Sequence, residues 1–152
     1  MNNYTTCTFT GHRELYEDFD EKLMERVVND LVKSGTEVFY TGMAMGFDLI
    51  AAECVLRLKK KCKNLKLIAC IPYRGQSENF TPSYKSRYKK VLKKCDESIC
   101  LHEEYCDGCF FERNRYMVDN SDVLVAYLRK KRGGTYYTVN YANNKNKKVI
   151  KI

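Results

Sequence analysis

A repeated alternation of strand-like and helix-like segments constrains the fold of this chain most strongly, and residues 37–61 show it best. An apolar strand-like run at 38–40 leads into a turn that contains Gly42, Gly46 and Asp48. Apolar side chains then recur at helical spacing, at Phe47, Ile50, Ala51, Cys54 and Leu58. Strand, turn and helix in this order form the unit of an α/β protein, whose ligands bind at the carboxyl ends of the strands.

The same alternation continues through all 152 residues and predicts further strands and helices. The expected strands cover residues 5–10, 37–41, 66–71, 97–101, 122–127 and 148–152, and the expected helices cover 17–34, 46–61, 81–94, 110–120 and 133–143. We therefore expect one Rossmann-like α/β domain over residues 1–152, with a mostly parallel sheet and helices on both faces. Right-handed crossovers place the turns that follow the strands along one rim of the sheet.

The charge of the chain favours anionic partners. The formal net charge is +8, and lysines cluster at 59–63, 85–94 and 145–151. Long-range attraction of anions follows from such a charge, but the charge does not identify the anion. The first two clusters fall on expected helix faces, where a solvated surface is the ordinary interpretation. Nucleic acid is a less favoured partner than a small anionic molecule.

Segments typical of membrane or secreted proteins are missing from the sequence. No run of about 18 apolar residues occurs, and the first residues do not resemble a signal peptide. We expect a cytoplasmic protein with no membrane partner. Of the eight cysteines, Cys7, Cys54, Cys70 and Cys100 fall in apolar runs, so most are expected to be reduced core residues.

The pair Cys106 and Cys109 has the spacing of a zinc-binding motif, but a second pair with matching spacing is missing. We expect neither a metal nor a cofactor.

Three turns together resemble those of a known family. They are Thr-Gly-His-Arg at 10–13; Gly42, Met43 and Ala44 with Gly46 and Asp48; and Ile71-Pro72 with Gln76. This combination resembles the YpsA/YoqJ-like branch of the SLOG superfamily, which includes DprA and the LONELY GUY phosphoribohydrolases. The resemblance covers nearly the whole chain. It implies a Rossmann-like domain that binds nucleotides or nucleotide-derived molecules, and a homo-oligomer.

The C-terminal half is similar to the phosphoribohydrolase pattern of an arginine, an apolar strand and a glycine-rich turn. Arg113 corresponds to the arginine, residues 121–126 to the strand and residues 133–135 to the turn. The proline and the third glycine of the family's turn are missing. Tyr137 stands where that family places its catalytic glutamate. The resemblance therefore favours binding of a nucleotide over its hydrolysis.

The candidate site residues come from these turns and from Arg113. Arginine can pair with phosphate through two hydrogen bonds, and backbone amides at a glycine-bearing helix start suit phosphate as well. Gln76 is expected to read a base edge, and Asp48 is expected to accept hydrogen bonds from ribose. The expected ligand-binding residues are Gly11, His12, Arg13, Gly42, Met43, Ala44, Gly46, Asp48, Pro72, Gln76, Arg113, Gly133, Gly134 and Thr135.

The leading functional expectation is recognition of a phosphate-bearing nucleotide, or of a molecule derived from one, by a sensor or sequestering protein. One alternative is a nucleoside monophosphate phosphoribohydrolase. Cleavage of an N-glycosidic bond needs a carboxylate, so its catalytic candidates are Glu53 and Asp48, with Arg113 on the phosphate. A second alternative is a DprA-like DNA-binding protein, which would require the lysine clusters to form one continuous stripe.

Overall fold

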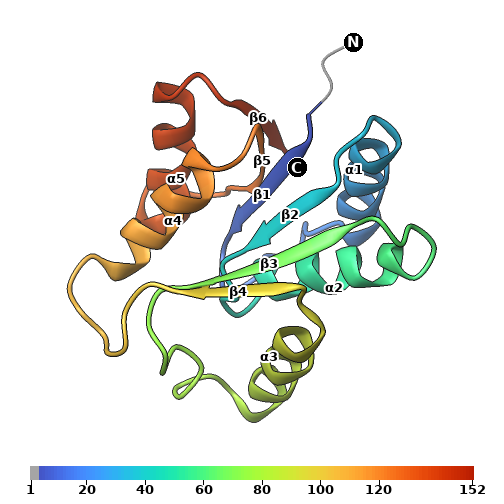
Figure 1. The fold of residues 1–152 in the computed structure, drawn as a ribbon. Coiled ribbons are helices and arrows are strands. Elements are labelled where there is room, and N and C mark those ends of the chain that lie inside the picture. Colours follow the sequence, from blue (N-terminus) through green and yellow to red (C-terminus); the bar gives the residue numbers. More distant parts are fainter. Residues whose placement is uncertain (1–3) are drawn as a thin grey trace.

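A parallel sheet forms the centre of the protein (Figure 1). The structure is a computed structural model, and it describes residues 4–152. Within these residues six strands occur in the order β4-β3-β2-β1-β5-β6, and every neighbouring pair is parallel. The strands are β1 (Thr6–Gly11), β2 (Val38–Thr41), β3 (Lys66–Ile71), β4 (Glu97–Cys100), β5 (Val123–Tyr127) and β6 (Lys148–Lys151). The expected α/β fold is confirmed.

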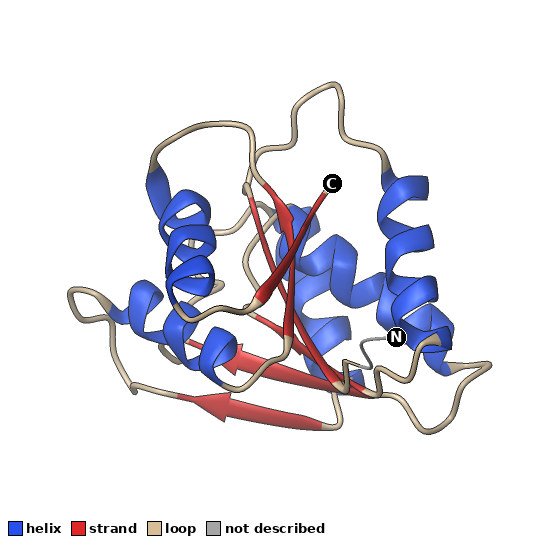
Figure 2. Cartoon of the chain, turned by 90° about the horizontal axis from the view of Figure 1, so that it is seen from above, coloured by secondary structure: helices blue, strands red, loops and turns tan. Residues whose placement is uncertain are grey.

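Helices cover both faces of this sheet (Figure 2). They are α1 (Glu21–Lys33), α2 (Phe47–Lys59), α3 (Pro82–Lys94), α4 (Cys109–Asp119) and α5 (Gly133–Asn144). The helices α1, α2 and α3 lie on one side, and α4 and α5 lie on the other. No helix within residues 4–152 combines the length and the apolar character that a bilayer span requires.

The interior strand β5 alternates its side chains between the two helix layers. In β5, Val123 and Val125 enter the larger core under α1, α2 and α3, whereas Leu124 and Ala126 pack under α4 and α5. All four side chains are buried because neighbouring strands and helices surround them. This two-sided burial explains the continuous apolar character of the β5 sequence, which is typical of a central parallel strand.

Capping residues set two of the helix starts. Asp20 accepts a hydrogen bond from the Leu23 backbone N–H at 3.0 Å, so α1 begins at Glu21 and not at residue 17. The expected start was wrong because helical spacing alone does not locate the cap. Thr81 accepts a hydrogen bond from the Tyr84 N–H at 3.4 Å, and Pro82 occupies the first helical position as expected.

The cysteines are free thiols. Cys7, Cys54 and Cys70 are buried, as the apolar runs around them predict. Cys100 is exposed, so its assignment to the core was wrong. It ends β4, which lies at the edge of the sheet and has no neighbouring strand on its outer side among the described residues.

Candidate functional site

The strand order changes direction at β1, and a pocket of about 530 Å³ opens where this change occurs. The chain runs from β1 to β2, β3 and β4 on one side and then returns to place β5 on the other side of β1. The loops after β1 and β5 therefore leave the sheet in different directions. Parallel α/β sheets bind ligands in such a crevice. We call this cavity the rim pocket; it is lined by residues 10–16, Ala44, Asp48, Phe110, Arg113, Asn114, Lys130 and residues 132–135.

His12 joins the loop after β1 to the loop after β5. Its Nε2 accepts a hydrogen bond from the Arg129 backbone N–H at 2.8 Å. The pKa of His12 lies below its usual value because the ring is buried and because the positive charges of Lys130 and Arg129 are near. The ring is therefore neutral at pH 7, with its proton on Nδ1. An imidazole in this state offers a ligand one fixed N–H donor.

Asp48 brings a buried carboxylate to the pocket. It lies in the first turn of α2, and 6% of its surface is exposed. Its Oδ2 accepts a hydrogen bond from the Ala44 N–H at 3.4 Å, whereas Oδ1 has no partner among the described residues. Burial raises the pKa of Asp48 to about 6, although Arg113 opposes that shift. A buried oxygen without a partner is costly, and a ligand hydroxyl would satisfy it.

Arg113 reaches the same region from α4 on the opposite side of the sheet. Its Nη1 donates to the carbonyls of Gly42 and, at 3.4 Å, of Cys70, and its Nε donates to Asn114 at 2.8 Å. Burial lowers the pKa of Arg113, and Asp48 counteracts that effect. The guanidinium therefore holds the ends of β2 and β3 in place as well as adding positive charge to the pocket.

Gly42 has no room for a side chain. A Cβ atom there would lie 2.8 Å from Asp48 Oδ2 and 2.9 Å from Arg113 Nη1. Met43, next in the chain, takes a left-handed φ of 62°, and its N–H donates to Thr41 Oγ1 at 3.2 Å. The turn after β2 is therefore shaped so that Asp48 and Arg113 approach each other across Gly42.

The turn after β5 provides an open helix start. Arg132 precedes α5 without making a side-chain cap, so the first N–H groups of the helix have no such acceptor. Gly133, Gly134 and Thr135 line the pocket, and Lys130 and Arg132 stand beside them as exposed cations. Amide donors, a helix N-terminus and cations together suit a phosphate group.

Nine of the expected ligand-binding residues line the rim pocket: Gly11, His12, Arg13, Ala44, Asp48, Arg113, Gly133, Gly134 and Thr135. The structure places the other five behind this lining. Gly42 and Met43 form the turn itself, and Pro72 is buried at the end of β3. Gly46 packs against the loop after β1, since a Cβ there would lie 2.2 Å from the Arg13 carbonyl oxygen.

Gln76 and Glu53 have other partners than the sequence suggested. The Gln76 amide donates to the Gly42 carbonyl at 2.9 Å and accepts from the Tyr88 hydroxyl at 3.4 Å, so it supports the turn and does not line the rim pocket. Glu53 lies outside the rim pocket and pairs with Arg87 of α3, with Oε2 3.0 Å from Nε. Spacing along α2 did not reveal which face of the helix meets α3.

Several residues that line the pocket were not predicted from the sequence: Glu14, Leu15, Tyr16, Phe110, Asn114, Lys130 and Arg132. Phe110 could have been found because it precedes Arg113 by three residues, which places both on one helix face. The guanidinium carbons of Arg13 and Arg113 lie 5.1 and 5.8 Å from the centre of the Phe110 ring. Within residues 4–152 no group of three or more potential metal ligands occurs, at Cys106 and Cys109 or elsewhere.

Comparison with known proteins identifies relatives by sequence. The YpsA family model, which describes the YspA SLOG family, matches residues 3–151. The SPbeta prophage-derived protein YoqJ of Bacillus subtilis is 31% identical over 134 residues, which span 80% of this chain and 78% of YoqJ. A UPF0398 protein of Bacillus cereus strain G9842 is 28% identical over 128 residues, which span 82% of this chain and 70% of that protein.

Two solved structures share the fold. DNA processing protein A (DprA) of Helicobacter pylori matches with a TM-score of 0.70 and 21% identity over 96% of this chain. DprA of Streptococcus pneumoniae matches with the same TM-score and identity over 97% of this chain. This chain spans only 64% and 50% of those two chains. The family model, the likeness to YoqJ and the shared fold agree: the chain belongs to the YspA SLOG family.

Proposed function

We propose that this protein binds a phosphate-bearing nucleotide, or a small molecule derived from one, in the rim pocket. One observation carries the proposal: the buried Asp48 carboxylate, one of whose oxygens has no partner among the described residues, lines a pocket that also contains four cations and the open start of α5. Phosphate matches the cations and the amides, and ribose hydroxyls match the carboxylate. A volume of about 530 Å³ suits a ligand of this size.

Binding is favoured over hydrolysis by the position of Tyr137. This residue stands where the phosphoribohydrolase pattern has its glutamate, but its hydroxyl accepts a hydrogen bond from Arg115 at 3.0 Å. Its ring packs against Phe111, with the ring centres 4.6 Å apart. The only pocket-lining carboxylates among the described residues are Asp48 and Glu14. A sensor or a sequestering protein needs no carboxylate at the glycosidic bond.

Removal of the two exposed cations beside α5 is expected to weaken nucleotide binding without loss of folding. Hydrogen bonds to charged groups contribute about 1.5–3 kcal/mol each, so Lys130→Ala with Arg132→Ala is expected to lower affinity about 100-fold. Mass spectrometry of retained and free fractions, after incubation with a nucleotide panel, identifies the ligand, and calorimetry then measures its affinity. Lys85→Ala with Lys89→Ala, which removes the same charge from α3, is the control.

Three outcomes are distinguishable in this experiment. Intact nucleotide in the retained fraction, lost in the pocket variant and kept in the control, supports the proposal. Free base together with ribose phosphate makes the protein a hydrolase. Retention of every nucleotide by the pocket variant at unchanged affinity contradicts the assignment of the site.

Nucleic acid is a second candidate ligand, at another surface. The DprA of Helicobacter pylori that shares this fold is described by its single-stranded DNA binding mode. A likeness at 21% identity supports only the fold, so the candidate rests on the charge of this chain. The observation that favours this candidate is that two lysine clusters, separate in the sequence, line the same groove in the folded protein.

A further inference from the structure

A groove of about 660 Å³ between α2 and α3 brings together two lysine clusters that are separate in the sequence. One side carries basic residues of the cluster at 59–63, and the other carries basic residues of the cluster at 85–94. The third cluster, at 145–151, follows α5 and continues through β6 at the far edge of the sheet. The continuous stripe through all three clusters that the DprA-like alternative would require is therefore not formed, because only two of them converge.

The positive charge of the groove is only partly neutralised. Its lining contains seven cations and one carboxylate, Glu53. Three of the cations form ion pairs: Arg57 with Glu25, Lys59 with Asp96, and Arg87 with Glu53. These pairs hold the walls together, since they join α2 to α1, to the segment before β4 and to α3.

Four lysines remain without an ion pair among the described residues: Lys60, Lys63, Lys90 and Lys94. All four are exposed, and they line one hollow from α3 and from the segment that follows α2. Positive charges held around a concave surface focus the field there and attract anions. A linear anion would neutralise several of them at once.

The surroundings favour a strand of nucleic acid over a membrane. The large exposed hydrophobic side chains of the described residues are Tyr16, Tyr105 and Phe111, and none of them lies on α2 or α3. A membrane-binding helix would present such side chains beside its cations. No aromatic side chain lines the groove, so bases have no stacking partner there.

We propose that the α2–α3 groove binds the phosphate backbone of nucleic acid without reading its bases. This inference rests on the second candidate function above, and it names the surface. The C-terminal ends of α2 and α3 lead into the amino ends of β3 and β4, whereas the rim pocket lies at the carboxyl ends of the strands. The groove and the rim pocket are therefore separate sites that can be tested independently.

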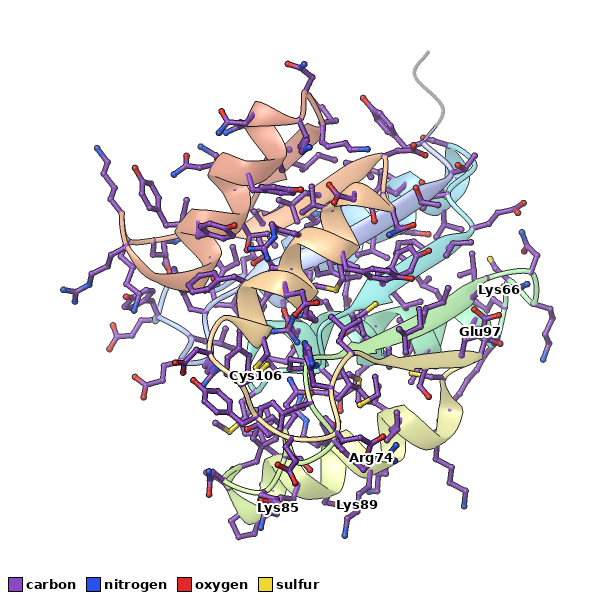
Figure 3. All side chains as sticks on the ribbon, turned by 60° about the vertical axis from the view of Figure 1, so that its left-hand side comes forward. Lys66, Arg74, Lys85, Lys89, Glu97 and Cys106 are labelled. Carbon is purple, nitrogen blue, oxygen red and sulfur yellow. The ribbon has the colours of Figure 1, made fainter. Side chains whose placement is uncertain are left out.

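The α3 helix offers a matched pair of variants. Lys90 and Lys94 line the groove, one helical turn apart. Lys85 and Lys89, labelled on α3 in Figure 3, have the same spacing but do not line the groove. Reversal of either pair to glutamate lowers the net charge equally and substitutes only exposed residues. Any difference in affinity between the two variants is therefore due to the position of the substituted lysines and not to the total charge.

Fluorescence anisotropy with a labelled oligothymidylate measures the effect. Lys90→Glu with Lys94→Glu is expected to weaken binding at least about 10-fold and to lower the slope of log K against log salt by about 1.4, since each phosphate contact on a single strand contributes about 0.7. Lys85→Glu with Lys89→Glu is expected to have a much smaller effect on both quantities. Oligocytidylate should bind as tightly as oligothymidylate.

Equal weakening by both variants would show that net charge alone drives the binding and would overturn the groove assignment. No binding of the oligonucleotide by the wild-type protein would overturn the nucleic-acid candidate together with the groove. Mononucleotide binding in the rim pocket should be unchanged in the groove variant, so the rim-pocket proposal stands or falls separately.

Discussion

Asp48→Asn is expected to make the protein more stable while weakening its hold on nucleotides. The wild-type carboxylate is buried with one oxygen unpaired, and burial raises its pKa to about 6. Each unit of such a shift corresponds to about 1.4 kcal/mol, so a neutral amide of the same shape is expected to add about 1–3 kcal/mol to the free energy of unfolding at pH 7. In a chain of this length that raises Tm by about 5 °C.

The contribution of Asp48 to the free energy of unfolding changes with pH in a defined direction. Because the pKa is raised in the folded state, the native protein binds more protons than the unfolded chain between about pH 4 and 6. The unfavourable contribution of Asp48 is thus fully present above pH 6 and is relieved as the pH falls through that value. The stability difference between variant and wild type should narrow over the same range, which chemical denaturation at several pH values measures.

Asp122→Asn is a control with the opposite sign. Burial of Asp122 alone would raise its pKa, but hydrogen bonds from Thr5 and Thr6 outweigh burial and lower it. Its carboxylate therefore stabilises the fold at neutral pH, and this contribution is lost as the pH falls. The Asp122 variant should be less stable than wild type at pH 7. A destabilised Asp48→Asn would contradict our account of its unpaired oxygen.

Ligand measurements on Asp48→Asn separate two effects of the substitution. Asparagine replaces one carboxylate oxygen with an NH2 donor and leaves an uncharged, weaker acceptor for ribose hydroxyls, so a nucleoside monophosphate should bind about 10-fold more weakly. It also removes a negative charge near the phosphate position, so inorganic phosphate should bind at least as well as it does to wild type. If the affinities for the nucleoside monophosphate and for inorganic phosphate change in the same direction and by the same factor, Asp48 does not contact the sugar.

The fold class was predictable because the sequence patterns that indicate its strands and helices each lie within a short stretch of the chain. The apolar run of β5 and the Thr81-Pro82 start of α3 each lie within a few neighbouring residues. The placement of the turns along one rim then followed from the crossovers, whereas the strand order was not predicted. Side-chain positions that depend on tertiary packing were harder to predict from the sequence, as the buried Gln76 shows. Its polarity suggested a loop that faces a ligand, but the amide meets the Gly42 carbonyl, 34 residues away in the sequence.

The pocket was predictable where it consists of turns that follow strands, since all such turns share one rim. Arg113 was assigned to it only through the family resemblance. Its position depends on how α4 packs across the sheet, because its guanidinium bonds the carbonyls of β3 and of the turn after β2. Phe110 lies three residues before Arg113 on the same helix face, so it could be assigned only once Arg113 had been. Nothing in the local sequence shows that the first turn of α4 returns to the end of β1.

Two glycine substitutions are expected to differ sharply, and together they test the architecture of the pocket. In Gly42→Ala the new methyl group would lie within 3 Å of both Asp48 and Arg113. Relief of that contact displaces Arg113 from the carbonyls it bonds and leaves buried groups unpaired. We expect a loss of about 2–4 kcal/mol in unfolding free energy, or about 10 °C in Tm.

Gly134→Ala is expected to preserve the fold and to remove the ligand. The nearest atom to the new methyl group is Asn114 Nδ2 at 3.9 Å, and the residue already lies in α5, so stability should stay the same or rise by about 0.5–1 kcal/mol. If phosphate lies against the backbone amides at the start of α5, the methyl group occupies its place, and affinity should fall with Tm unchanged. Thermal denaturation with and without nucleotide measures both quantities in one experiment. Wild-type affinity in Gly134→Ala would show that the phosphate does not lie against the backbone of Gly134.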